Sequence, residues 1–166
     1  MIRFYNCKIL TLDGNFDITE GCELWTDGDK IAYIGKEKEG IFEREIDCKG
    51  NVIMPGFKNA HAHSPMTFLR SYAEDLPLDR WLNEAVFPME AKLENDDALW
   101  FSKLAVMEYL TSGITAAFDM YFLPHAIAEA AKETGFTSVL CGAVNNFVSS
   151  PDELEKDHLY FNDYGE

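Results

Sequence analysis

The first 50 residues alternate apolar and polar positions over short stretches, a pattern typical of half-buried β-strands. The pattern predicts strands over 2–5, 8–12, 22–26 and 30–34. Asp27-Gly28 lies between the last two stretches and is a hairpin signal, because both positions of a tight two-residue turn adopt positive φ. These features predict a small all-β unit over 1–51.

Beyond this unit, strand-like stretches alternate with helix-like ones. Residues 52–54 form a continuous apolar run, as in strands that are covered on both faces. The clearest unit is a strand–helix–strand stretch over 114–141, in which Pro124 suits the first helical turn and Gly135 the exit from the helix. Such alternation favours βαβ units with a parallel sheet, so an α/β region is expected over 52–166.

Two further helices are expected ahead of residue 114. One has Asn95 as its candidate N-cap and ends before Gly113. The apolar residues expected on its buried face are Leu99, Trp100, Val106, Met107 and Leu110. The other covers 78–87 and should stop at Pro88, which has no N–H to donate.

Composition describes a globular chain, since 47% of its residues are hydrophobic and 13% are aromatic. Its length of 166 residues fits one domain. A closed eight-stranded β/α barrel typically takes ~250 residues. A barrel signature in this chain would therefore belong to an incomplete barrel.

The charge balance narrows the classes of partner. Lys and Arg number 14 and Asp and Glu 29, for a formal net charge of −15, which excludes nucleic acid and an acidic membrane surface because both attract clustered basic residues. No apolar stretch approaches the ~20 residues that span a bilayer, and the start of the chain lacks the features of a signal peptide. The four cysteines show no Cys-x-x-Cys spacing, which favours reduced thiols. The expectation is a soluble, cytoplasmic protein.

His61 and His63 are the candidate metal ligands. In an extended chain, side chains alternate between the two faces, so residues two apart point to the same side. The pair follows the apolar run at 52–54 and a Pro55-Gly56 turn. Two imidazole nitrogens at the carboxyl end of a first barrel strand would lie where active sites of that fold lie.

The motif Pro55-Gly56-Phe57 followed by His61-Ala62-His63 resembles the signature of the amidohydrolase superfamily, in which a β-sandwich segment leads into a metal-dependent TIM-type (β/α) barrel. The runs SPMTFLRSYAEDLPLDRWLNEAVFPMEAKL and SGITAAFDMYF are similar to the branch of 5′-methylthioadenosine and S-adenosylhomocysteine deaminases and related chlorohydrolases. The resemblance implies that 1–51 is a small β-sandwich segment and 52–166 the first β/α units of a barrel that is incomplete in this chain.

The resemblance also implies a substrate site. Glu90 matches the family position whose carboxylate accepts hydrogen bonds from the ribose hydroxyls of a nucleoside. Trp81 is expected to wall the pocket. Asp119 and Tyr121 fall at the carboxyl end of the second barrel strand and are expected to line the site.

For the reaction, the resemblance implies deamination of an adenine-type nucleoside. Zinc, or another divalent metal such as iron, would lower the pKa of bound water toward ~7 and supply hydroxide for attack on the amine-bearing carbon. Family members take their further ligands and the general acid/base carboxylate from strands beyond residue 166, so no catalytic residue is expected in this chain, which alone should be inactive. His125 and His158 do not match ligand positions and are expected at the surface.

Two other readings stay open at this stage. One is a chlorohydrolase or a guanine- or cytosine-type deaminase of the same superfamily. The other is a non-catalytic fragment that acts only by association, either with the missing carboxyl-terminal part of the barrel or with copies of itself. No arginine occurs after Arg80, so this stretch supplies no arginine clamp for the carboxylate of S-adenosylhomocysteine.

Overall fold

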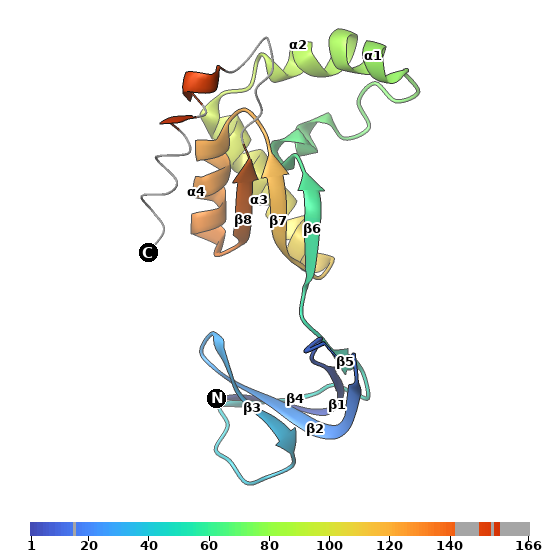
Figure 1. Ribbon diagram of the computed structural model, residues 1–166, viewed down its shortest axis with the longest axis vertical. Helices are drawn as coiled ribbons and strands as arrows, with labels where there is room; N and C mark the ends of the chain where they lie inside the picture. Colours follow the sequence, from blue (N-terminus) through green and yellow to red (C-terminus); the bar gives the residue numbers. More distant parts are fainter. Residues whose placement is uncertain (15, 142–149, 154, 157–166) are drawn as a thin grey trace. The chain divides into compact units, whose positions relative to one another are not determined.

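The structure, a computed structural model, describes residues 1–14, 16–141, 150–153 and 155–156. The chain divides into two compact units, Met1–Pro55 and Gly56–Glu166 (Figure 1). The first is built from strands and the second from strands and helices, so the chain is a mixed α/β protein, as its sequence pattern predicts. Among the helices of the described ranges, none has the length and apolar character needed to cross a membrane.

The first unit is a five-stranded sheet in which β3, β2, β1 and β4 are neighbours in that order and β5 pairs with β1. Its strands are β1 (Ile2–Leu10), β2 (Ile18–Asp27), β3 (Lys30–Lys36), β4 (Arg44–Asp47) and β5 (Val52–Ile53). The predicted strands over 2–5 and 8–12 are one strand, because a bulge at Asn6 (φ 52°) bends the chain without ending its pairing. The predicted hairpin is present, but its turn is Gly28-Asp29, one residue later than expected.

The apolar run at 52–54 does not begin the second unit. Val52 and Ile53 pair in parallel with Lys8 and Ile9 of β1. Val52 is 47% exposed, so the run is not covered on both faces as expected. The boundary between the units therefore follows Pro55 and not residue 51. Periodicity shows that a short segment is apolar, whereas its pairing partner is decided by tertiary contacts.

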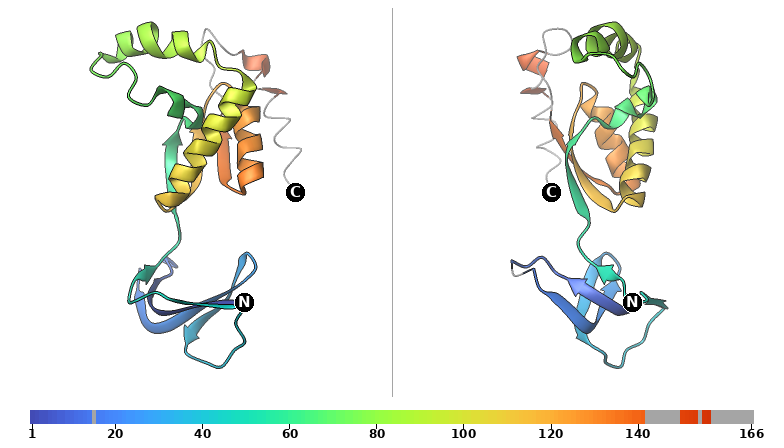
Figure 2. Two further views of the ribbon diagram at one scale, coloured as in Figure 1. Left: turned by 180° about the vertical axis from the view of Figure 1, so that it is seen from behind. Right: turned by 90° about the vertical axis from the view of Figure 1, so that its right-hand side faces the viewer.

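The second unit contains a parallel three-stranded sheet in the order β6-β7-β8. Its main elements are β6 (Phe57–Ala62), α3 (Asn95–Thr111), β7 (Ile114–Met120), α4 (Pro124–Thr134) and β8 (Thr137–Cys141). Both views of Figure 2 show α3 and α4 on the same side of the sheet. A core cluster of buried residues on that side consists of Ala62, Val106, Ala117 and Phe136. The strand–helix–strand prediction over 114–141 is confirmed, with Gly135 in the left-handed region at φ 69°.

Helix α3 buries mainly small side chains, and few of the large ones expected. Its buried residues are Ala98, Ser102, Ala105 and Val106. Trp100, Met107 and Leu110 are 67%, 64% and 51% exposed, so these three expectations are wrong, whereas Val106 is buried as expected. Small residues allow the helix to approach the sheet closely. The pattern of apolar residues along the sequence does not reveal this close approach. The N-cap is Glu94, which forms a capping box with Asp97, and not Asn95.

The predicted helix over 78–87 does not stop at Pro88. Helix α1 (Leu78–Arg80), the π-helix η2 (Trp81–Val86) and helix α2 (Phe87–Glu90) follow one another through the proline. The N–H of Phe87 donates to the carbonyl of Leu82, five residues earlier, so the turn before Pro88 is wider than an α-turn. A wider turn gives the proline ring the room that a regular helix denies it.

Gly56 leaves room for a side chain of the neighbouring strand. A Cβ at this position would lie 2.9 Å from the Cβ of Thr115 and closer still to its γ atoms. Thr115 is β-branched and therefore stiff, and its hydroxyl accepts a hydrogen bond of 2.8 Å from Lys58. We expect Gly56→Ala to reduce the free energy of unfolding by about 1–3 kcal/mol, read from the urea midpoint. Adding Thr115→Ala should recover most of the loss; an unchanged midpoint in the single variant would refute the steric argument.

Candidate functional site

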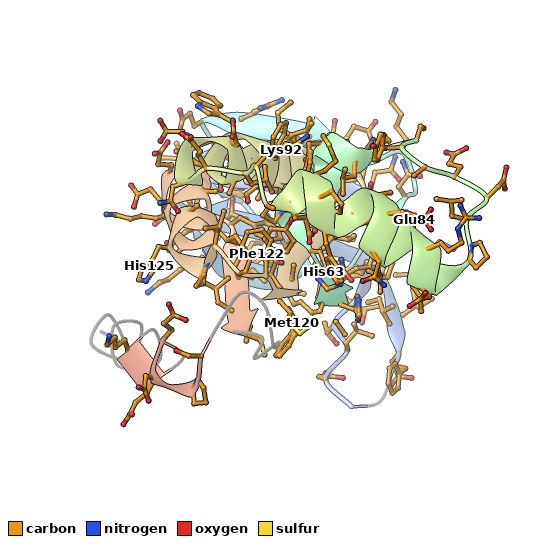
Figure 3. The ribbon with its side chains drawn as sticks, turned by 90° about the horizontal axis from the view of Figure 1, so that it is seen from above. His63, Glu84, Lys92, Met120, Phe122 and His125 are labelled. Atoms are coloured by element: carbon orange, nitrogen blue, oxygen red, sulfur yellow. The ribbon has the colours of Figure 1, made fainter. Side chains whose placement is uncertain are left out.

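The candidate site lies at the carboxyl end of β6. Ala62 points to the helix-covered side, where it packs in the core with Val106 and Ala117. Because side chains alternate along an extended chain, His61 and His63 lie together on the other side. Seen from above in Figure 3, His63 lies beside Met120, at the end of β7. The local reason for the pairing is thus an alanine between two histidines at the end of a strand.

The two imidazoles face each other through their Nε2 atoms, which are 3.1 Å apart. Nδ1 of His63 lies 2.6 Å from the main-chain oxygen of Met120. A carbonyl can only accept, so Nδ1 carries the proton and Nε2 of neutral His63 keeps its lone pair. Two nitrogens on one tetrahedral zinc at bond lengths of about 2.0–2.1 Å are roughly 3.3 Å apart. The spacing and donor type of the pair therefore fit two ligands of a single metal ion.

Asp119 lies on the helix-covered side of the sheet, opposite the side on which the two histidines lie. Asp119 is 1% exposed, and both oxygens of its carboxylate accept from the backbone N–H of Ser64, at 3.1 and 3.3 Å. The hydroxyl of Ser64 in turn lies 3.0 Å from the hydroxyl of Tyr109 on α3. Asp119 therefore holds the chain immediately after His63 on the helix-covered side. This differs from the expectation that Asp119 lines the substrate pocket, because the alternation along β7 turns it toward α3.

Tyr121 and Glu90 form the second polar contact of the site. The hydroxyl of Tyr121 donates to Oε1 of Glu90 at 2.7 Å. Tyr121 is 5% exposed, and the centres of its ring and the His63 ring are 6.5 Å apart. Burial, followed by the hydrogen bond to the Glu90 carboxylate, raises the pKa of Tyr121 far above its usual value. The phenol is therefore a permanent donor, and it ties the end of α2 to the end of β7, the strand next to the one that carries the histidines.

The remaining candidate residues are Trp81, His125 and His158. Trp81 is half-buried at the first position of η2. His125 is exposed in the first turn of α4, as expected, and His158 lies outside the described residues. Among the residues that the structure describes, no third His, Cys, Asp or Glu joins a metal-binding cluster. Within that part of the chain, the pair of histidines would supply two ligands of a four-ligand site.

Two residues that contribute to the site, Met120 and Tyr109, are not predictable as contributors from the sequence. Met120 acts through its main-chain carbonyl, which no side-chain pattern can reveal. Tyr109 approaches Ser64 across 45 positions of the chain. Its place on the sheet-facing side of α3 was open to prediction from helical spacing, but its partner was not.

Comparisons with known sequences identify the family of this chain. A family model described as the amidohydrolase family matches residues 52–161. The chain is 43% identical over 155 residues to 5-methylthioadenosine/S-adenosylhomocysteine deaminase 1 of Archaeoglobus fulgidus, a match that covers 93% of this chain and 35% of that protein. It is 38% identical over 135 residues to the 5′-deoxyadenosine deaminase of Methanococcoides burtonii, which covers 81% of this chain and 31% of that protein. The chain thus spans about a third of the length of these curated relatives.

Two solved structures share the fold. An adenosine deaminase from Xanthomonas campestris with bound zinc gives a TM-score of 0.85 at 26% identity, over 98% of this chain and 39% of that one. The atrazine chlorohydrolase of Arthrobacter aurescens TC1 complexed with zinc gives 0.84 at 22% identity, over 98% of this chain and 43% of that one. The family model covers more than half of the sequence, and the relatives match nearly all of it. This chain belongs to the amidohydrolase family.

Proposed function

We propose that this chain is the amino-terminal portion of a metal-dependent hydrolase that deaminates an adenine-type nucleoside, 5′-methylthioadenosine or S-adenosylhomocysteine. The observation that carries the proposal is the pair of Nε2 atoms, 3.1 Å apart, at the carboxyl end of β6. The names of the relatives support the class of substrate, since they describe deaminases of adenosine derivatives. The likeness to the chlorohydrolase rests on 22% identity and supports the fold alone.

For the fold, the proposal is that the second unit forms the first strands of a TIM-type (β/α) barrel and the first unit a small sandwich segment. Three parallel strands with both connecting helices on one side support this arrangement. On the other side of the sheet, Phe118 is 44% exposed and its neighbour Val139 52% exposed. In a barrel these side chains would face the interior, so the partner of this surface is the remainder of the barrel.

His61 and His63 would hold the metal, with zinc as the candidate and iron as another divalent choice. A metal held by imidazoles activates water for attack at neutral pH. In this chain, the Met120 carbonyl keeps the proton of His63 on Nδ1, and Asp119 fixes the backbone that follows. Both contacts hold the imidazole of His63 in its ligand orientation. No residue of this chain is assigned to proton transfer.

Glu90 would bind the ribose. Its carboxylate lies at the end of α2, held by Tyr121 near the His63 ring. Two vicinal hydroxyls that donate to one carboxylate form charge-assisted hydrogen bonds. Trp81 would add an apolar wall from η2. No arginine follows Arg80 in this sequence, so an arginine clamp for the carboxylate of S-adenosylhomocysteine would come from the remainder of the protein.

The proposal is tested with the longest chain that the native gene encodes. We expect this protein to contain a divalent metal by elemental analysis and to release ammonia from 5′-methylthioadenosine. The same protein treated with a chelator should lose both properties and regain them with zinc. Chloride release from a chlorotriazine without ammonia release from any nucleoside would replace the deaminase assignment by a chlorohydrolase one.

A further inference from the structure

We propose that Tyr121 is a positioning residue, which holds the Glu90 carboxylate so that its free acceptor sites face the ribose of the substrate. The inference rests on the proposed nucleoside deaminase function and deepens it. It also changes the role of Tyr121, which the sequence places in contact with the substrate. The geometry instead directs its hydroxyl to Oε1 of Glu90, at 2.7 Å.

The first support is the burial of Tyr121. With 5% of its surface exposed, the residue offers a ligand almost no surface. Its ring stacks on Phe122, with ring centres 4.4 Å apart, and lies 6.5 Å from the centre of the His63 ring. The ring therefore has aromatic neighbours, and its one polar atom donates to Glu90. A rigid donor of this kind fixes the acceptor that it contacts.

The second support is the position of Glu90 itself. Glu90 ends α2, in a segment that leaves the sheet after His63 and returns only at α3. This segment includes left-handed, non-glycine residues at Ser71 and Asp75, and Leu78 within it is 69% exposed. A glutamate on such a segment has several rotatable bonds. The hydrogen bond from Tyr121 joins it to the end of β7 across 31 positions of the chain.

The acceptor count leaves room for the substrate. An ionised carboxylate has about four lone-pair sites, and Tyr121 uses one of them. The two ribose hydroxyls would use two more. Because the side chain is already ordered before substrate arrives, its immobilisation does not weaken binding.

The test compares two substrates in the longest chain that the native gene encodes: 5′-methylthioadenosine and the same nucleoside without its 2′ and 3′ hydroxyls. We expect Tyr121→Phe to lower kcat/KM about tenfold for the first substrate, mainly through KM. The kcat/KM for the dideoxy substrate and the metal content of the protein should be unchanged. The matched control is Tyr72→Phe, which removes a hydroxyl from a tyrosine that is 46% exposed. This variant should leave kcat/KM unchanged for both substrates.

A double variant separates an action through Glu90 from an independent one. Tyr121→Phe added to Glu90→Ala should cause no further loss, because the group that Tyr121 positions is then absent. If Tyr121→Phe unfolds the protein, Glu90→Asp provides the second variant, since it draws the carboxylate back from the phenol and should show the same loss confined to the ribose substrate.

The outcomes are distinguishable. Equal losses on both substrates, or additive losses in the double variant, overturn the positioning role. If Glu90→Ala is ribose-selective and Tyr121→Phe is silent, the role of Glu90 stands and this inference fails alone. A parent protein that releases no ammonia from either nucleoside overturns the proposed function and this inference with it.

Discussion

Replacement of His61 or His63 with alanine should remove most of the bound metal and lower kcat/KM for deamination on the order of 10³-fold, because a metal contributes several kcal/mol to the transition state. Each imidazole supplies one of the two Nε2 atoms that are 3.1 Å apart, so neither has a substitute among the described residues. The measurements are metal stoichiometry by elemental analysis and ammonia release in the longest native chain.

The matched control for the histidine variants is His125→Ala. His125 is an exposed histidine in the same unit, at the first turn of α4. This variant should keep its full metal content and activity. If the double variant His61→Ala/His63→Ala retained the metal stoichiometry of the parent, the pair would have no role as ligands, and the observed contact between the rings would be structural.

Glu90→Ala should lower kcat/KM for 5′-methylthioadenosine by about 10²-fold while sparing the metal. The estimate follows from the loss of two hydrogen bonds to a charged group, each worth about 1.5–3 kcal/mol, with partial replacement by water. The loss should be confined to substrates with a ribose diol. The measurement is the ratio of kcat/KM for the nucleoside and its dideoxy analogue.

Glu84→Ala is the control for Glu90→Ala. Glu84 lies in the preceding η2 and forms an exposed ion pair with Arg80, at 2.8 Å. Exposed pairs of this type contribute about 0–1 kcal/mol to stability, so the variant should be close to the parent in both activity and melting temperature. An equal loss for the nucleoside and the dideoxy analogue in Glu90→Ala would assign Glu90 a structural role.

Local signals in the sequence predicted the elements that depend on local physics. The helix between Pro124 and Gly135 was predictable because proline fits a first turn and glycine adopts the left-handed exit at little cost. The common side of His61 and His63 followed from the two-residue period of an extended chain. The motif around them also identified the family, since its residues are contiguous.

Tertiary packing, and not the local sequence, decided which strands pair and which side chains are buried. Val52 and Ile53 are apolar enough for either sheet, and only the contact with β1 assigned them to the first. The exposure of Trp100 depends on how closely α3 approaches the sheet. Pro88 continues its helix because the preceding turn is wide, a geometry that no single residue encodes. In each of these positions the local sequence allowed more than one state of similar energy, and tertiary packing chose between them.

The sequence by itself determined which groups are present: an imidazole pair at two-residue spacing, a carboxylate at position 90 and a phenol at position 121. The tertiary structure decided what each group does next to the others. It turned Asp119 toward Ser64, directed the proton of His63 to Met120 and joined Tyr121 to Glu90. These contacts link residues that are 31 to 57 positions apart. At such separations the chain has no local preference, so hydrogen-bond partners are fixed only when the strands and helices pack.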